Sequence, residues 1–380
     1  MKALKLSLVV LYCIFGLCVF CQNNKSYLAE GLIEYHNLFY QGMKDSVACY
    51  RIPTVVTAPN GDLVAVIDER VSNCNDLNGN KNINIVSRIS KDNGHTWSAI
   101  KTIIDFPFGK SASDPSIIVD NFTKELFLFY NYMDYTSEKD VYYLHVVKSN
   151  DNGQTWSEPV DITPQITKPE WHKEWKFMTS GAGIQTRSGQ LLHTIDHVKR
   201  GVYIFGSNDH GKTWFMIDNP INPADESKIV ELNDGSWMVN SRVNRAGNRY
   251  VYTSKNNGIN WQSKADSNLI DPGCNAGFIR YTSLKEGDDK NRLLFANIKT
   301  KDKRQNICVR ISYDEGKSWT EGKTIYSGSA AYSSITILNN SDIGLFFEKD
   351  DYKENVFVSF SLEWLSNGTD KYKKVNKINH

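Results

Sequence analysis

The chain has 380 residues and carries 44 Lys and Arg residues against 43 Asp and Glu residues, which gives a formal net charge of +1. This balance excludes a globally basic protein of the kind that binds nucleic acid or an anionic membrane, so an acidic ligand requires a local cluster of Arg or Lys. Hydrophobic residues make up 40 % of the chain and aromatic residues 12 %, enough to bury a large core.

The N-terminal segment has the order of an export signal. Lys2 and Lys5 precede an apolar run at residues 6–20, which is too short and too close to the N-terminus for a membrane-spanning helix. We therefore expect residues 1–21 to be a cleaved signal peptide and the mature protein to be secreted, in the periplasm or outside the cell. The alternative is a lipid anchor on Cys21.

Four cysteines remain beyond this segment and form no C-x-x-C pair; they are Cys49, Cys74, Cys274 and Cys308. Their wide spacing argues against a zinc site, and we expect no metal and no other cofactor. Export permits disulfides, but the sequence alone cannot pair these residues. Disulfides and four buried thiols therefore both stay open.

A short motif, here called the Asp box, recurs five times in the middle of the chain. The copies are S-K-D-N-G-H-T-W from Ser90, S-N-D-N-G-Q-T-W from Ser149, S-N-D-H-G-K-T-W from Ser207, S-K-N-N-G-I-N-W from Ser254 and S-Y-D-E-G-K-S-W from Ser312. The fourth copy lacks the Asp and the Thr, which should weaken its turn. Most copies start 58 or 59 residues apart, which indicates a repeat architecture.

The residue types of the Asp box predict a tight turn. Asp and Asn hydrogen-bond their own backbone, Gly supplies a positive φ, and Trp covers the hairpin with a large apolar surface. Runs rich in Val, Ile and Tyr, typical of strands, precede most boxes at residues 83–89, 141–147, 201–206 and 306–311. We therefore expect each box to connect two strands as part of the scaffold, and not to bind sugar or calcium.

The repeat spacing predicts an all-β fold, a six-bladed β-propeller of four-stranded antiparallel blades. Five blades carry a box. The sixth contains a strand at residues 355–361, followed by L-E-W, and we expect it to close the ring by pairing with a strand from residues 31–40. Residues 22–380 then form a single domain, with a core at about residues 30–365 and a loose polar tail at residues 372–380.

R-I-P at Arg51–Pro53, followed by the Asp boxes, resembles the exo-sialidases (neuraminidases) of glycoside hydrolase family 33. The resemblance covers nearly the whole mature chain, from Tyr50 to Glu348. It implies a propeller enzyme that hydrolyses terminal α-linked sialic acid from sialylated glycans by a retaining mechanism. It also implies a monomer that needs no cofactor, no nucleic acid and no obligatory protein partner.

A sialidase must hold the carboxylate that sialic acid carries on its anomeric carbon. Guanidinium groups bind a carboxylate through two parallel hydrogen bonds, and the family uses three of them. The matching residues are Arg51 in R-I-P, Arg242 in M-V-N-S-R and Arg304 in R-Q-N-I. Other Lys and Arg residues lie close to Arg304 in the sequence, so this match is the least specific of the three.

The nucleophile of the family is a tyrosine, because a carboxylate would be repelled by the substrate carboxylate. Tyr332, in S-A-A-Y-S-S, matches that nucleophile, and Glu226, in A-D-E-S-K, matches the glutamate that takes its proton. Asp76, in S-N-C-N-D-L, matches the acid that protonates the leaving oxygen and then activates water. The nearby Asp68 and Glu69 are expected to end the strand that begins at Leu63.

Three further residues match positions that contact the substrate or support the site. Arg70 matches an arginine near O4 of the sugar, and Asp114, in S-D-P-S, matches a pocket residue; a plain turn aspartate before Pro115 is the alternative. Glu348, in G-L-F-F-E, matches the carboxylate that holds Arg51, since a buried arginine beside other cations needs such a partner. The alternative for Glu348 is an ordinary glutamate at the end of a strand.

Other functions remain open. A trans-sialidase, or an intramolecular variant that forms an anhydro sugar, would use the same residues with aromatic side chains over the acceptor, and Trp171, Trp175 and Phe177 are candidates. A propeller that binds sialic acid without catalysis, or a scaffold for protein partners, would not need the tyrosine, glutamate and aspartate together. The glycine-rich run Ser180–Ile184 departs from the family pattern, which leaves the fit around the glycerol tail open.

Overall fold

The computed structural model describes residues 34–373. The expected signal peptide at residues 1–21, the lipid anchor on Cys21 and the end of the tail lie outside the described residues. Within the described part, none of the helices combines the length and the apolar character that a membrane crossing requires. The helices are short: α1 (Thr163–Ile166), α2 (Leu362–Leu365), and the 3-10 turns η1 (Leu77–Gly79), η2 (Pro169–Trp171) and η3 (Leu284–Glu286).

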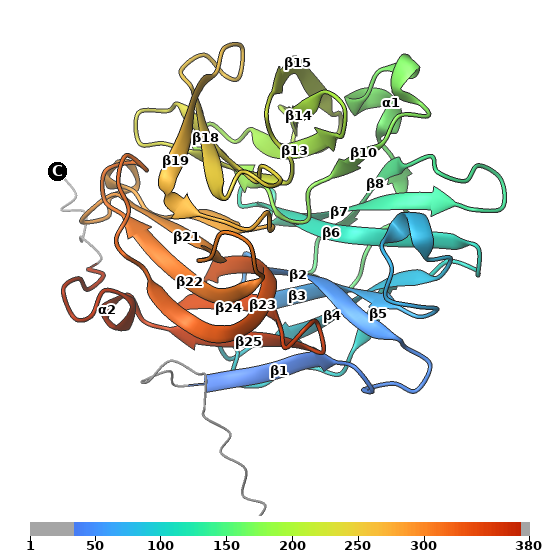
Figure 1. Cartoon of the computed structure of the whole chain (residues 1–380), viewed down its shortest axis with the longest axis horizontal. Coiled ribbons are helices and arrows are strands. Elements are labelled where there is room, and N and C mark those ends of the chain that lie inside the picture. The colour runs from blue at the N-terminus through green and yellow to red at the C-terminus, as the bar shows by residue number, and fades with distance from the viewer. Residues whose placement is uncertain (1–33, 374–380) are drawn as a thin grey trace, which may run out of the picture.

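The chain folds into β-sheets that follow one another around a common centre in chain order (Figure 1), which confirms an all-β propeller. The first sheet contains β2 (Cys49–Thr57), β3 (Leu63–Arg70), β4 (Ile83–Ser90) and β5 (Lys101–Ile104). The second contains β6 (Lys110–Asp120), β7 (Glu125–Asp134), β8 (Tyr143–Ser149), β9 (Val160–Asp161) and β11 (Gly181–Ala182).

The third and fourth sheets continue the ring. The third contains β10 (Lys176–Met178), β12 (Ile184–Gln185), β13 (Leu191–His197), β14 (Gly201–Ser207) and β15 (Phe215–Ile221). The fourth contains β16 (Ser227–Glu231), β17 (Trp237–Ser241), β18 (Asn248–Ser254) and β19 (Gln262–Ile270). The pairing is antiparallel except where β11 of the second sheet runs parallel to β6.

The fifth sheet has seven strands and closes the ring. Its members are β20 (Gly277–Thr282), β21 (Arg292–Ile298), β22 (Gln305–Ser312), β23 (Lys323–Ile337), β24 (Ile343–Lys349), β25 (Glu354–Phe360) and β1 (Glu34–Tyr40). The strand β23 is 15 residues long; its first half pairs with β22 and its second half with β24. β1 pairs antiparallel with β25 (Figure 1), so the expected pairing of the two ends of the chain is confirmed.

All five Asp boxes connect two strands, as expected, and the serine of each box is the last residue of the preceding strand. In the third box, Ser207 Oγ accepts the Gly211 N–H at 2.8 Å, and the Asp209 carboxylate accepts the N–H and the hydroxyl of Thr213 at 2.9 and 2.6 Å. The degenerate fourth box keeps the turn through Asn256, which accepts the Asn260 N–H and the Ser254 hydroxyl at 2.9 and 3.0 Å but has no threonine hydroxyl to bind.

The tryptophan of a box also contacts the preceding sheet, which the sequence did not predict. The Trp97 ring lies 5.1 Å from that of Phe357, and the Trp214 ring 5.7 Å from that of Phe127. A Cβ added to Gly211 would lie 2.3 Å from the Phe127 ring, so this glycine permits the close approach of the turn. The core accordingly consists of apolar clusters between neighbouring sheets.

One smaller expectation needs correction at the C-terminal end. The L-E-W segment, to which no structure was assigned from the sequence, forms α2, and Ser361 caps this helix by accepting the N–H of Trp364. The tail is ordered at its start, where the Tyr372 hydroxyl donates to Asp288 at 3.0 Å.

Candidate active site

Six of the residues expected in the site come from the first, fourth and fifth sheets and meet in one cluster. Arg51 lies in β2, and Glu226 directly precedes β16. Arg242 directly follows β17, and Arg304 directly precedes β22. Tyr332 and Glu348 lie in the neighbouring strands β23 and β24. A propeller brings such residues together because its sheets are arranged around one central axis.

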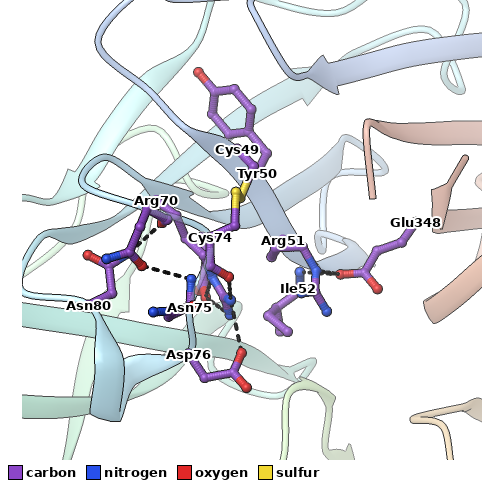
Figure 2. Close-up of a disulfide and its surroundings, with 12 residues drawn as sticks. Cys49, Tyr50, Arg51, Ile52, Arg70, Cys74, Asn75, Asp76, Asn80 and Glu348 are labelled. Atoms are coloured by element: carbon purple, nitrogen blue, oxygen red, sulfur yellow. Dashed lines mark hydrogen bonds and ion pairs between the residues drawn. A yellow bond between two sulfur atoms is a disulfide. The ribbon is translucent and has the colours of Figure 1, made fainter. Parts of the chain in front are cut away.

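Glu348 accepts three hydrogen bonds in this cluster. Its Oε1 accepts the Arg51 Nε–H at 2.6 Å and the Ile52 N–H at 3.0 Å, and its Oε2 accepts the Tyr332 N–H at 3.1 Å. The Glu348 side chain is 0 % exposed, and Figure 2 shows it facing Arg51 across the junction of the two sheets. Ile52 has a φ of 67°, a strained value for a β-branched residue. Glu348 thus joins Arg51 to the backbone of Tyr332.

Arg242 links Tyr332 to Glu226. Its Nη1 donates to the Tyr332 hydroxyl at 2.9 Å and also to Glu226 Oε2. Burial raises the pKa of Tyr332 well above its usual value and Glu226 raises it further, whereas Arg242 and Arg304 lower it. The neutral phenol is therefore the resting form, and it lies beside both a carboxylate and two cations.

Arg304 also lies close to Tyr332. Its guanidinium carbon lies 5.3 Å from the centre of the Tyr332 ring, and its nitrogens donate to the Tyr352 hydroxyl and the Gly273 carbonyl at 3.2 Å each. The Arg51 guanidinium lies 3.9 Å from the Tyr352 ring. Tyr352 was not among the expected site residues, although it follows Glu348 by only four positions.

Arg70, Asp76 and Asp114 form a second cluster beside the first. The buried Arg70 donates from Nη1 to Asp76 Oδ1 and to the Cys74 carbonyl at 2.9 Å each (Figure 2), and from Nη2 to Asp68 Oδ2 at 3.1 Å. The Asp76 side chain is 77 % exposed. A carboxyl group held from one side and open to solvent on the other can exchange protons with a bound ligand.

The expectation that Asp68 and Glu69 end their strand is wrong. β3 continues to Arg70, and Asp68 and Glu69 pair with Ile85 and Asn84 of β4. Asp68 is fully buried, and it is held there because its carboxylate binds Arg70, Ser113 and the backbone N–H of Asp114.

Asp114 lies inside β6, at a break in the pairing with β7, and not in a plain turn. Its φ is 59°, and its Oδ2 accepts the Asn131 side-chain amide at 3.1 Å. Burial, followed by the charges of Asp68 and Asp76, raises the pKa of Asp114 to about 8. Asp114 therefore carries a proton in the resting site at neutral pH, where it can donate a hydrogen bond.

Further polar residues, which were not singled out from the sequence, lie around Glu226. Asp225 lies 3.7 Å from Arg242 Nε, and burial together with Asp225 raises the pKa of Asp196 well above its usual range. The buried Lys228 donates to Asn275 at 2.7 Å, and burial lowers its pKa to about 7. Asp225 and Lys228 flank Glu226 in the sequence, which was the available signal. No comparable signal marked Asp196 and Asn275, because only the fold brings these two residues near Glu226.

Two of the three aromatic residues considered for an acceptor site belong to the core. Trp171 is buried against His197 and Tyr203, and Phe177 packs against a cluster that contains Tyr142. Trp175 is 43 % exposed and stacks on Tyr142 with ring centres 6.2 Å apart. In the part of the chain that the structure describes, no three His, Cys, Asp or Glu side chains are grouped to hold a metal ion.

The comparison with known families assigns the chain. The family described as BNR repeat-like domain matches residues 56–345, a range that contains all five Asp boxes. The chain belongs to the BNR repeat-like domain family.

Relatives of this BNR repeat-like protein are named sialidases, which confirms the resemblance predicted from the sequence. A sialidase of Micromonospora viridifaciens is 33 % identical over 83 % of this chain, and a sialidase of Bacteroides fragilis is 28 % identical over 80 %. The matches cover 52 % and 60 % of those two proteins, so the chain spans little more than half of their length.

A solved structure agrees with the fold of the BNR repeat-like chain. The Hadza microbial sialidase Hz136 superimposes with a TM-score of 0.80 at 27 % identity, covering 87 % of this chain and 69 % of the other. The propeller architecture is therefore common to both proteins.

Proposed function

We propose that the protein is an exo-α-sialidase, a glycoside hydrolase that releases terminal sialic acid from glycoproteins, glycolipids and oligosaccharides. The observation that carries the proposal is the arrangement of three arginines at Tyr332. Arg242 donates to the Tyr332 hydroxyl and Arg304 lies 5.3 Å from its ring, whereas Arg51 is joined to its backbone through Glu348. Three guanidinium groups near a partly buried phenol suit an anionic substrate whose reacting carbon bears the carboxylate. The relatives named sialidases support the same activity.

The first chemical step forms one bond and breaks another. The Tyr332 oxygen bonds to the anomeric carbon while the bond from that carbon to the aglycone oxygen breaks. Glu226 takes the phenol proton, and Asp76 gives its proton to the departing oxygen. A tyrosine approaches the substrate carboxylate without the repulsion that a carboxylate nucleophile would meet.

The position of Arg242 suggests how substrate binding starts this step. In the free site its Nη1 donates to both Tyr332 and Glu226, so the guanidinium occupies the carboxylate oxygen that would accept the phenol proton. A substrate carboxylate competes for the same guanidinium and attracts it away from Glu226. The Tyr332 hydroxyl can then donate to Glu226 and lose its proton.

The second step restores the enzyme. Water attacks the anomeric carbon, Asp76 takes a proton from this water, and the bond to Tyr332 breaks. Tyr332 recovers its proton from Glu226. Two displacements at the same carbon retain the configuration of the sugar. Arg70 and Asp114 are proposed to bind the sugar hydroxyl and amide groups, since both lie beside Asp76 in the second cluster.

The test is release of sialic acid from a fluorogenic aryl α-sialoside and from sialyl-lactose, each with and without didehydro-sialic acid. We expect turnover of both substrates and inhibition of both reactions by didehydro-sialic acid. Binding of the analogue without turnover would favour a sialic-acid-binding propeller. Neither binding nor turnover would show that the arginine assignment is wrong.

Transfer to another glycan is a second candidate, because Trp175 is exposed and stacks on Tyr142, whose pKa is raised by burial and then by Asp114. An aromatic platform there would favour a sugar acceptor over water. Product analysis with and without added lactose separates the two reactions. Sialyl-lactose formed from the aryl substrate would indicate transfer, and free sialic acid alone would indicate hydrolysis.

Three further proposals concern the architecture and the compartment. The two halves of β23 belong to different four-stranded groups, which supports six blades and a single domain over residues 22–380. The disulfide between Cys49 and Cys74 supports export, since such bonds persist in oxidising compartments. Monomeric assembly and independence from nucleic acid and obligatory partners stay predictions.

A further inference from the structure

A disulfide joins two parts of the candidate active site. Cys49 begins β2, two positions before Arg51, and Cys74 lies in the β3–β4 loop (residues 71–82), two positions before Asp76. The Cα atoms of the two cysteines are 5.8 Å apart and their sequence separation is 25. Figure 2 shows the sulfur bridge between the strand that carries Arg51 and the loop that carries Asp76.

The half of the loop that contains Asp76 has little packing of its own. Residues 72 and 74–76 are exposed, and apart from Cys74 this segment has no apolar side chain between Val71 and Leu77. Leu77 is buried and its carbonyl accepts the Tyr135 hydroxyl, so the apolar anchor of the loop lies after Asp76. Exposed segments with few apolar contacts open locally at low free energy.

Two interactions tie this half of the loop to the neighbouring strands, in addition to the bond within the loop from the buried Asn80 side chain to the Asn73 carbonyl at 2.7 Å. Arg70 Nη1 donates to the Cys74 carbonyl and to Asp76 Oδ1, both at 2.9 Å. The disulfide fixes the side chain of Cys74 to β2. The Arg70 side chain is completely buried, so its position is set by the core. Arg70 therefore directs the Asp76 carboxyl group, and the disulfide keeps the backbone of Cys74 within reach of Arg70.

We propose that the Cys49–Cys74 disulfide positions Asp76 relative to Arg51, and thereby sets the distance between the proton donor and the carboxylate-binding arginines. The inference rests on the proposed sialidase function for the role of Asp76. A general acid contributes only when its proton lies within hydrogen-bond reach of the leaving oxygen. The two cysteines are positioning residues, since they act through the loop and do not contact the reacting atoms.

This role predicts a loss that depends on the leaving group. An aryl alcohol departs without protonation, whereas the sugar hydroxyl of lactose requires it. In the Cys49→Ser/Cys74→Ser variant, kcat/KM for sialyl-lactose should fall about tenfold and kcat/KM for the aryl sialoside less than twofold. A purely structural role would reduce both values equally, and an equal fall or no fall on either substrate overturns the inference.

Cys308→Ser is the matched control, because Cys308 is a buried free thiol away from this loop. The control should keep the ratio of the two activities, and the same selective loss in it would contradict the inference. Wild-type protein reduced with dithiothreitol provides a second route that needs no refolding of a variant. The reagent supplies two electrons and two protons, forms its own cyclic disulfide, and leaves Cys49 and exposed Cys74 as thiols.

Amide hydrogen exchange separates failure of this inference from failure of the proposed function. Loss of the disulfide should speed exchange at residues 72–76 at least tenfold and leave β3 protected. If neither sialoside is turned over by the wild type, the function is wrong, and exchange still decides whether the disulfide holds the loop. Unchanged exchange at residues 72–76 overturns the inference whatever the activity.

Discussion

Glu348 holds Arg51 through a 2.6 Å ion pair in which the carboxylate is completely buried. The second oxygen of the same carboxylate accepts the backbone N–H of Tyr332. One side chain therefore positions both the arginine proposed to bind the substrate and the strand that carries the proposed nucleophile. A buried carboxylate with three donors is a rigid reference point for the site.

Replacing Glu348 by Gln should weaken substrate binding. The variant leaves Arg51 without its anion, so we expect KM for the aryl sialoside to rise at least tenfold and the free energy of unfolding to fall by about 3 kcal/mol. Steady-state kinetics and urea unfolding measure the two effects. Glu363→Gln, an exposed glutamate of α2, is the control and should change neither. An unchanged KM in Glu348→Gln would contradict the positioning of Arg51.

Replacing Asp76 by Ala should separate the two classes of substrate. Without the acid, kcat/KM for sialyl-lactose should fall at least a hundredfold, whereas the aryl sialoside, which needs no proton, should lose far less. Asp45→Ala removes an exposed aspartate from another loop and serves as control. Equal losses on both substrates would exclude Asp76 as the acid.

Asp114 should make stability depend on pH. Its folded-state pKa, about 8, lies above the usual value of 3.8. Between these values the folded protein holds a proton that the unfolded chain releases, so this contribution to stability falls as pH rises from about 4 to about 8. Across that pH window, the free energy of unfolding of the wild type should fall by on the order of a few kcal/mol relative to that of Asp114→Asn, as measured by urea unfolding. If the free energy of unfolding of the wild type, relative to that of Asp114→Asn, stayed constant or rose with pH, this prediction would be contradicted.

The Asp boxes should contribute to stability and not to catalysis. Asp209→Ala removes the acceptor of two hydrogen bonds to Thr213, whereas Asn256→Ala in the degenerate box removes one to Asn260. We expect losses of about 2 and about 1 kcal/mol in the free energy of unfolding, with kcat/KM within twofold of the wild type. A loss of activity without a loss of stability would point to a ligand site in the box.

Local chemistry made the boxes and their strands predictable from sequence. Ser, Asp and Gly at fixed positions define the turn, and the strands before the boxes lie close to their expected ranges. The strand expected at residues 141–147 is instead Tyr143–Ser149, because the box serine pairs in the sheet while its hydroxyl accepts the turn N–H. The ring closure by β1 and β25 also followed from counting repeats.

The supporting half of the site depends on contacts that no local pattern encodes. Cys49 and Cys74 are paired because the fold brings the β3–β4 loop next to the start of β2, and the sequence left this pairing open. Tyr352 lies under Arg51 through the turn after β24, and Asp196 reaches Asp225 from a different sheet. The resemblance brought forward the residues expected to face a substrate together with Glu348, which holds Arg51, whereas the other supporting residues emerge only from the packing.

The measurement that tests the central claim most directly is the capture of a covalent intermediate on Tyr332. A fluorine beside the anomeric carbon slows the second displacement, so a 2,3-difluoro sialic acid should remain attached to the nucleophile after fluoride leaves. Mass spectrometry of the digested protein should find the added sugar on the peptide that contains Tyr332, and Tyr332→Phe should carry none. A sugar attached to another residue, or equal labelling of Tyr332→Phe, would contradict the account.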